Sequence, residues 1–261
     1  METFAPVARI DTIRLLVALT AQRQWCIHQL NVKSALLNGF LEEEIYIDQP
    51  QGFIVLGKEH MVYRLKNALY GLKQDPRAWY ARMDSYLISL GFERSTSEPT
   101  LCVKKKEAET QLIVSLYVDD LLVIGGDNND LADFKAKMMN MFEMSDLGLM
   151  TYFLGMEVYQ AEGRIFLGQK TFSMKILKTF SMENSKSTST PMAVGMKLSS
   201  QDDHDRVDES AYRSLVGCLL YLTATRPDVM FSVSMLSRFM HCCNKQHLQV
   251  AKRVLRYIKG T

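Results

Sequence analysis

The chain has few of the features that mark secreted or membrane proteins. Its five cysteines are odd in number and follow no framework spacing, which argues against a disulfide-stapled fold and favours reduced thiols. No stretch approaches the ~18 uninterrupted apolar residues of a membrane span. The start of the chain lacks the basic and apolar regions of a signal peptide. We therefore expect an intracellular protein that is not secreted and has no membrane partner.

Acidic residues are scarce in the last part of the chain. Residues 167–261 contain 14 Lys and Arg against 7 Asp and Glu, whereas residues 1–166 contain 17 against 22. Residues 236–261 have no acidic side chain, and their basic residues recur at helical spacing: Lys245, Lys252, Arg256 and Lys259. The opposite stripe is apolar: Leu248, Ala251, Leu255 and Ile258. Such a basic face can follow a phosphate backbone, and the alternative is a solvated helix face.

Hydrophobic periodicity predicts an α+β fold in which strands and helices alternate before an all-helical end. Strands are predicted at residues 25–32, 44–48, 61–66, 101–105, 112–116, 152–159 and 164–168. Helices are predicted at residues 11–24, 76–91, 130–142, 171–180, 208–224, 227–240 and 245–259. A polar loop is expected at about 181–207. The predicted domains are 1–168 and 169–261.

The sequence Tyr117-Val118-Asp119-Asp120 lies within the apolar stretch LIVSLYVDDLLVIGG. A strand pair folded about a tight turn would carry both aspartates to its tip, where their oxygens can hold Mg²⁺. Two such ions roughly 4 Å apart promote phosphoryl transfer. The alternative is a solvated turn that contains two aspartates.

Seven segments carry a more specific signal, because they follow in order over essentially the whole chain. They are ETFAPVARIDTIR, QLNVKSALLNGFLEEEIYIDQPQGF, YRLKNALYGLKQDPRAWY, SLYVDDLLVIGG, DLGLMTYFLGMEV, STPM and AYRSLVGCLLYLTATRPDVMFSVSMLSRF. Together they resemble the reverse transcriptase of copia-type long-terminal-repeat retrotransposons.

This resemblance implies a right-hand polymerase palm, an antiparallel sheet with packed helices, followed by a helical thumb or connection region. The implied activity is RNA-directed DNA polymerisation by two-metal nucleotidyl transfer, with Mg²⁺ or Mn²⁺ and dNTP substrates. Implied partners are an RNA or DNA template–primer and the integrase and ribonuclease H parts of the Pol polyprotein. The implied location is a cytoplasmic particle or the nucleus.

The resemblance also assigns positions in this sequence. The implied metal ligands are Asp119, Asp120 and the main-chain carbonyl of Val32. Residues implied to line the incoming nucleotide are Leu36, Tyr70, Gly71, Lys73 and Pro76. A hairpin implied to grip the primer end contains Phe153, Leu154, Gly155, Met156 and Glu157. Phosphate contacts are expected from Lys252, Arg256 and Lys259 on the basic helix.

Two positions of this sequence, 31 and 36, depart from the family pattern. Asn31 stands where the family has its first metal-binding aspartate, so a carboxylate is replaced by an amide that brings N–H donors toward a cation. Losing ~4 kcal/mol of transition-state stabilisation would lower the rate roughly 10³-fold. Leu36 replaces the usual aromatic residue that packs under the nucleotide sugar.

The resemblance begins within the family's domain, so we expect the fingers strands to be largely missing and the chain to be a fragment of the polyprotein. Two hypotheses follow. In the first, the chain is a reverse transcriptase domain that is weakly active or inactive because of Asn31. In the second, it is a non-catalytic relic that only binds nucleic acid.

Two further clusters have simpler explanations than metal binding. The sequence His241-Cys242-Cys243 with His247 contains zinc-type ligands, but it lacks CxxC spacing, so we expect half-buried thiols. Asp127 and Asp130 flank two asparagines without the pattern of a calcium loop, and we expect Asp127 to cap a helix.

Overall fold

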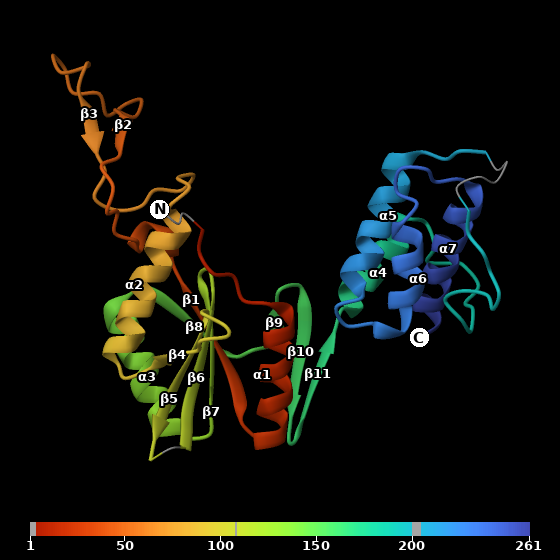
Figure 1. Ribbon diagram of the computed structural model, residues 1–261, viewed down its shortest axis with the longest axis horizontal. Helices are drawn as coiled ribbons and strands as arrows, with labels where there is room; N and C mark the ends of the chain where they lie inside the picture. Colours follow the sequence, from red (N-terminus) through yellow and green to blue (C-terminus); the bar gives the residue numbers. More distant parts are fainter. Residues whose placement is uncertain (1–3, 108, 200–204) are drawn as a thin grey trace. The chain divides into compact units, whose positions relative to one another are not determined.

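The computed structural model describes residues 4–107, 109–199 and 205–261, which divide into two compact units. Unit 1 contains the described residues up to Thr151 together with Gln160–Ile165. Unit 2 contains Tyr152–Tyr159 and the described residues from Phe166 to Thr261. No helix in the described residues has the length and apolar character that a membrane crossing requires. The elements of both units are labelled in Figure 1.

Unit 1 is organised around a six-stranded antiparallel sheet. From one edge to the other, its strands are β4 (Glu93–Arg94), β5 (Leu101–Lys106), β6 (Glu109–Tyr117), β7 (Asp120–Gly125), β1 (Cys26–Val32) and β8 (Met144–Leu149). The central strands β6 and β7 are apolar on both faces, which is the pattern of strands that are covered on both sides. The sequence did not predict β8, because MSDLGL is a polar, partly exposed edge strand without regular alternation.

Helices cover both faces of this sheet (Figure 1). Helices α2 (Asp75–Ser89) and α3 (Asn128–Met141) share a core with alternate residues of the central strands. This core includes Leu30, Val32, Trp79, Met83, Leu121, Val123, Phe134 and Met138. Helix α1 (Ile10–Arg23) lies on the opposite face and buries Ile13, Leu16 and Val17. Asp127 caps α3 as predicted, since its Oδ1 accepts from the backbone N–H of Asn129 at 2.7 Å.

A short two-stranded sheet follows a 3₁₀ turn at Ala35–Asn38. Its strands β2 (Tyr46–Asp48) and β3 (Val62–Arg64) fall within the longer predicted ranges. Every residue of the intervening loop from 50 to 61 is exposed. Gln49 holds this loop together, because its Nε2 donates to the Met61 carbonyl at 2.9 Å and its Oε1 accepts from the Val55 N–H at 2.8 Å.

A three-stranded sheet has the order β11 (Arg164–Gly168), β10 (Met156–Ala161) and β9 (Tyr152–Phe153). The single strand predicted at 152–159 is wrong, because a two-residue turn divides it. Leu154 and Gly155 both have positive φ, 48° and 79°, and Phe153 pairs with Met156 across the turn. The apolar pattern runs through this turn, which is why periodicity did not reveal it.

Unit 2 ends in four helices: α4 (Lys170–Thr179), α5 (Glu209–Leu222), α6 (Met230–Ser237) and α7 (Lys245–Gly260). They enclose an apolar core that includes Tyr212, Leu215, Leu219, Val233, Val254 and Leu255. Helix α6 is shorter than predicted because Pro227–Val229 forms a 3₁₀ turn before it. The fold is therefore mixed α and β with antiparallel sheets, which confirms the predicted class at this level.

Candidate active site

The two aspartates lie at the tip of the β6–β7 hairpin. Tyr117 and Asp120 are directly opposite each other, so Val118 and Asp119 form the two-residue turn. Val118 has φ of 54°, which is rare for a β-branched residue and costs on the order of 1–3 kcal/mol. Asp119 is exposed and Asp120 is half-buried. The turn therefore presents the Asp119 carboxylate to solvent, whereas the Asp120 carboxylate is half-buried against neighbouring residues.

Two hydrogen bonds from outside the hairpin hold this strained turn. The indole Nε1 of Trp79 on α2 donates to the Val118 carbonyl at 2.6 Å, and the backbone N–H of Val32 on β1 donates to the Asp119 carbonyl at 2.8 Å. Trp79 is 1% exposed and packs edge-to-face against Phe142. The core of unit 1 thus fixes the turn through its backbone, without using either carboxylate.

Asn31 lies directly opposite Asp120 on the neighbouring strand β1. Its Nδ2 donates to Asp120 Oδ1 at 3.3 Å, so these two positions of the candidate metal site lie together. A second amide reaches the same oxygen, because Gln29 Nε2 donates to it at 2.9 Å. Sequence reasoning missed Gln29. The only available signal was its position two residues before Asn31, which places both side chains on one face of a strand.

This donor set is a poor match for two divalent ions. Mg²⁺ and Mn²⁺ are bound by oxygen ligands, and carboxylates supply the charge that holds two cations together. Here position 31 presents N–H groups in place of a carboxylate. One oxygen of Asp120 already accepts two hydrogen bonds, one from Asn31 and one from Gln29. Among the described residues, no three His, Cys, Asp or Glu side chains gather in a way that could hold a metal ion.

Five residues are predicted to line the nucleotide: Leu36 on the 3₁₀ turn, Tyr70, Gly71 and Lys73 on the loop that enters α2, and Pro76 in the first turn of α2. Leu36 is partly buried against the core of unit 1, so it fills an apolar position. Tyr70, Gly71, Lys73 and Pro76 are exposed, and Gly71 has φ of 101°. Glycine suits this conformation because other residues rarely adopt it.

Asp75 organises this loop and was missed by the sequence analysis. Its side chain is buried, with 1% of the residue exposed. Its Oδ1 accepts from the Leu69 N–H at 3.3 Å, and its Oδ2 accepts from the Leu72 N–H at 3.0 Å. The loop that carries Tyr70 and Gly71 is therefore closed onto the first turn of α2. Asp75 precedes Pro76 at the start of the helix. An aspartate is common there because its negative charge interacts favourably with the helix dipole, so its type alone gave no sign of this role.

The hairpin predicted to grip a primer is the β9–β10 turn. Phe153 and Met156 are buried, whereas Leu154, Gly155 and Glu157 are partly exposed. The Tyr221 hydroxyl on α5 donates to the Leu154 carbonyl at 2.8 Å. Glu157 Oε1 accepts from the Thr171 N–H at the start of α4 at 2.8 Å, and hydrogen bonding from Thr171 lowers the pKa of this carboxyl.

The predicted basic face of α7 is partly occupied by the chain itself. Lys252 is exposed, but Lys259 Nζ donates to the Ser185 carbonyl at 2.7 Å. The backbone of Arg256 accepts from the Thr188 N–H at 3.4 Å. The polar segment Ser185–Thr190 thus lies along α7. The opposite stripe is buried as predicted at Ala251, Leu255 and Ile258.

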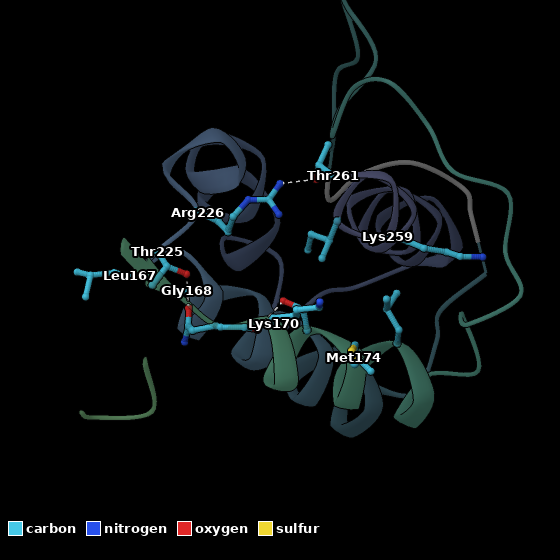
Figure 2. A pocket seen from close by; sticks show the side chains of 12 residues that line it. Leu167, Gly168, Lys170, Met174, Thr225, Arg226, Lys259 and Thr261 are labelled. Carbon is cyan, nitrogen blue, oxygen red and sulfur yellow. Dashed lines mark hydrogen bonds between the residues drawn. The ribbon is translucent and has the colours of Figure 1, made fainter. Parts of the chain in front are cut away.

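A cavity of about 500 Å³ in unit 2 also borders Lys259 (Figure 2). Its other basic residues include Lys170 and Arg226, but each cation has a partner within the chain. Arg226 donates to both carboxylate oxygens of Asp228 and to the Thr261 hydroxyl. Lys170 lies close enough to Glu157 to lower the pKa of that carboxyl. Carboxylates therefore offset the charges of Arg226 and Lys170, whereas the partner of Lys259 is a neutral carbonyl.

His247 caps the start of α7. Its Nδ1 accepts from the Asn244 N–H at 3.1 Å, while Asn244 Oδ1 accepts from the His247 N–H at 3.0 Å. Its ring also stacks on Phe239 at 4.0 Å between centroids. All five cysteines are free thiols, and burial raises the pKa of Cys243. The helix cap thus supplies a structural role for this histidine.

Comparison with known proteins identifies the class to which this fold and site belong. Residues 1–194 match the family described as reverse transcriptase (RNA-dependent DNA polymerase), and the chain belongs to this family. It is 39% identical to the retrovirus-related Pol polyprotein from transposon TNT 1-94 of Nicotiana tabacum, over 100% of this chain and 20% of that protein. It is 38% identical to the Pol polyprotein from transposon RE1 of Arabidopsis thaliana, over 100% of this chain and 18% of that protein.

A shorter relative is the putative transposon Ty5-1 protein of Saccharomyces cerevisiae, which is 33% identical over 89% of this chain and 76% of that protein. These relatives confirm the predicted resemblance to copia-type Pol sequences. The chain spans about a fifth of the length of the two plant polyproteins.

Proposed function

We propose that the chain is a reverse transcriptase domain of a retrotransposon Pol polyprotein whose nucleotidyl transfer is impaired. The family is metal-dependent, and Asp119 and Asp120 lie at the hairpin tip that would face the ions. The observation that carries the proposal is the hydrogen bond from Asn31 Nδ2 to Asp120 Oδ1, because it places a donor where the chemistry needs a negatively charged ligand.

In this proposal, unit 1 acts as the palm with part of the fingers, and the helical end acts as thumb or connection. Asp119, Asp120 and the Val32 carbonyl are the positions from which Mg²⁺ or Mn²⁺ would be held. The incoming dNTP would contact the region of Leu36, Tyr70, Gly71, Lys73 and Pro76. Phe153–Glu157 would contact the primer end.

Nucleic acid would be bound through charge on α7, with Lys252, Arg256 and Lys259 as the candidate contacts. Binding would be independent of sequence, because basic side chains on one helix face read phosphates rather than bases. The natural partners would be an RNA or DNA template–primer and other parts of the polyprotein, such as integrase and ribonuclease H. The proposed location is intracellular, in a particle or the nucleus, and the five free thiols support it.

A primer-extension assay on a homopolymer template tests the proposal. We expect the unmodified chain to extend primers at or near background, because one of the family's carboxylates is an amide. Asn31→Asp restores the ligand charge, so we expect Mn²⁺ binding in isothermal titration and a gain in extension of up to roughly 10³-fold. Asp119→Ala in the Asn31→Asp chain should abolish that gain.

Robust extension by the unmodified chain, lost on Asp119→Ala, would show that an amide suffices at position 31. Failure of the Asn31→Asp chain to bind Mn²⁺ would contradict the assignment of the hairpin tip as the metal site. A longer Pol segment that carries Asn31 serves as a control, because it separates the effect of the amide from that of chain length.

A further inference from the structure

Asp120 accepts hydrogen bonds from neighbouring side-chain amides, which a carboxylate that binds a metal ion does not need. Two side-chain amides from one strand donate to a single oxygen, Oδ1, at 2.9 Å from Gln29 and 3.3 Å from Asn31. The two donors are two residues apart on β1, so both side chains lie on the face of the sheet that carries Asp120. This oxygen is therefore satisfied by protein groups alone.

The Gln29 donor is the more constrained of the two. Gln29 is 8% exposed and is flanked on β1 by Leu30, which is fully buried. A buried amide N–H that loses its acceptor destabilises the folded state, because no water replaces the bond. If Asp120 turned away to bind a cation through Oδ1, Gln29 would lose its bond. The folded state thus favours Asp120 in its present orientation.

Electrostatics act in the same direction. The N–H groups of both amides carry partial positive charge and point at the oxygen, which is the role that a cation would otherwise fill. We infer that Gln29 and Asn31 form an amide clamp that makes Asp120 a structural acceptor, so that the hairpin tip of this chain is stable without a divalent cation. The inference depends on the proposed function only for identifying this tip as the family's metal site.

A restored carboxylate at position 31 would have the opposite effect. Asn31 and Asp120 are directly opposite each other on adjacent strands, and like charges at such positions repel. In Asn31→Asp, two carboxylates would share the space now occupied by one carboxylate and one donor. A divalent cation would then stabilise the fold by offsetting their repulsion.

Thermal unfolding of the full chain with and without Mn²⁺ tests the clamp. We expect the unfolding midpoint of the unmodified chain to be unchanged by Mn²⁺. Asn31→Asp should lower the midpoint in the absence of metal, and Mn²⁺ should recover it. Gln29→Leu should lower the midpoint of the unmodified chain. In a double-mutant cycle with Asp120→Leu, the coupling should be about tenfold to a hundredfold in the unfolding equilibrium constant.

A matched control is available in the same unit. Gln111 Nε2 donates to Asp130 Oδ2 at 3.0 Å, away from the hairpin tip. Gln111→Leu removes an amide–carboxylate bond of the same kind, and should lower stability without changing the response to Mn²⁺ in either the unmodified or the Asn31→Asp chain. The side-chain amide resonance of Gln29 should shift in the NMR spectrum of Asp120→Leu but not in that of Asp130→Leu.

Two results would overturn the clamp. One is an Asn31→Asp chain as stable without metal as the unmodified chain. The other is an unmodified chain that Mn²⁺ stabilises as strongly as Asn31→Asp. Neither result depends on polymerisation, so an Asn31→Asp chain that binds Mn²⁺ without gaining primer extension would contradict the proposed role of Asn31 in impairing transfer and leave the clamp standing.

Discussion

Val118 shows how a single residue can fix the direction of the two aspartates. Its left-handed backbone is unfavourable for a branched side chain, and it persists only because the surrounding structure holds it. The bonds from Trp79 and Val32 provide that support from two separate elements. The orientation of the tip therefore derives from the core of unit 1. The sequence shows both aspartates and the tryptophan, but nothing in their spacing indicates that the indole bonds to the turn.

Gly155 permits a prediction at the same scale. A Cβ at this position would lie 1.4 Å from the Tyr221 hydroxyl oxygen, and φ is 79°. Gly163 has a similar φ of 66° but nothing within 4 Å of its Cβ position. In urea unfolding, Gly163→Ala should cost about 1–2 kcal/mol from backbone strain alone. Gly155→Ala should cost clearly more, because Tyr221 must also move and lose its bond to Leu154. Equal losses would contradict the packing described for this turn.

His28 gives unit 1 a pH dependence. Burial and the nearby charge of Lys135 lower the pKa of His28 from its ordinary value of 6.5, although Asp146 partly opposes this. The folded state thus binds fewer protons than the unfolded state below about pH 6.5, and stability falls as the pH drops through this range. We expect the free energy of unfolding to decrease below that pH in urea titrations. His28→Gln should reduce the decrease, and His60→Gln, at an exposed position, should not.

At the scale of elements, α7 is more restricted as a nucleic-acid contact than its sequence suggests. The spacing of its basic residues correctly predicts one polar and one apolar face. It does not reveal that Ser185–Thr190 lies along the helix, because such contacts come from residues more than 60 positions away. Among the three predicted contacts, Lys252 is exposed and Lys259 is bonded to Ser185.

The contrast between Lys252, which is exposed, and Lys259, which is bonded to Ser185, leads to a prediction for binding to primer–template. Reversing the charges of Lys252, Arg256 and Lys259 together should flatten the slope of log affinity against log salt by roughly two to three units if all three contact phosphates. Because Lys259 already has a partner, we expect Lys252→Glu to account for about one unit and Lys259→Glu for less. Lys105→Glu, at a position paired with Glu93 in unit 1, is the control and should leave the slope unchanged. An unchanged slope in the triple variant would mean that α7 does not bind phosphates.

The elements that could be predicted from sequence are those with strong local signals. Helix α1, the β6–β7 hairpin and α7 have clear periodicity, and each was predicted to within a few residues. Strand β8 was missed because its polar sequence has no regular alternation, and the turn at Leu154 does not interrupt the apolar pattern, so only the resemblance implied a hairpin there. Within the site, the aspartates and Asn31 could be found from the motifs, whereas Gln29 and Asp75 could not. Their roles depend on partners that only the folded chain brings near.

At the scale of the whole molecule, the excess of positive charge and the two aspartates of the hairpin tip lie in different parts of the chain. Residues 167–261 have a net charge of +7 from 14 basic and 7 acidic residues, whereas both aspartates belong to unit 1. Under the proposed function, electrostatic binding to a phosphate backbone should therefore depend mainly on the second part, and nucleotidyl transfer on the first. A mutation in one part should leave the function of the other largely intact.

A separation of function in the Asn31→Asp chain tests this division. Asp119→Ala should lower primer extension by about 10² to 10³-fold, because a charge that stabilises the transition state is lost. The same change should leave affinity for primer–template within about twofold, because it removes one negative charge at the exposed hairpin tip and no basic side chain that could contact a phosphate. Lys252→Glu should weaken affinity at low salt, while extension at saturating primer–template stays near the parent rate.

Filter binding and single-turnover extension measure the two quantities on the same preparations. If Asp119→Ala weakened binding as much as Lys252→Glu, the substrate would be held mainly at the hairpin tip, and the division of labour along the chain would be wrong.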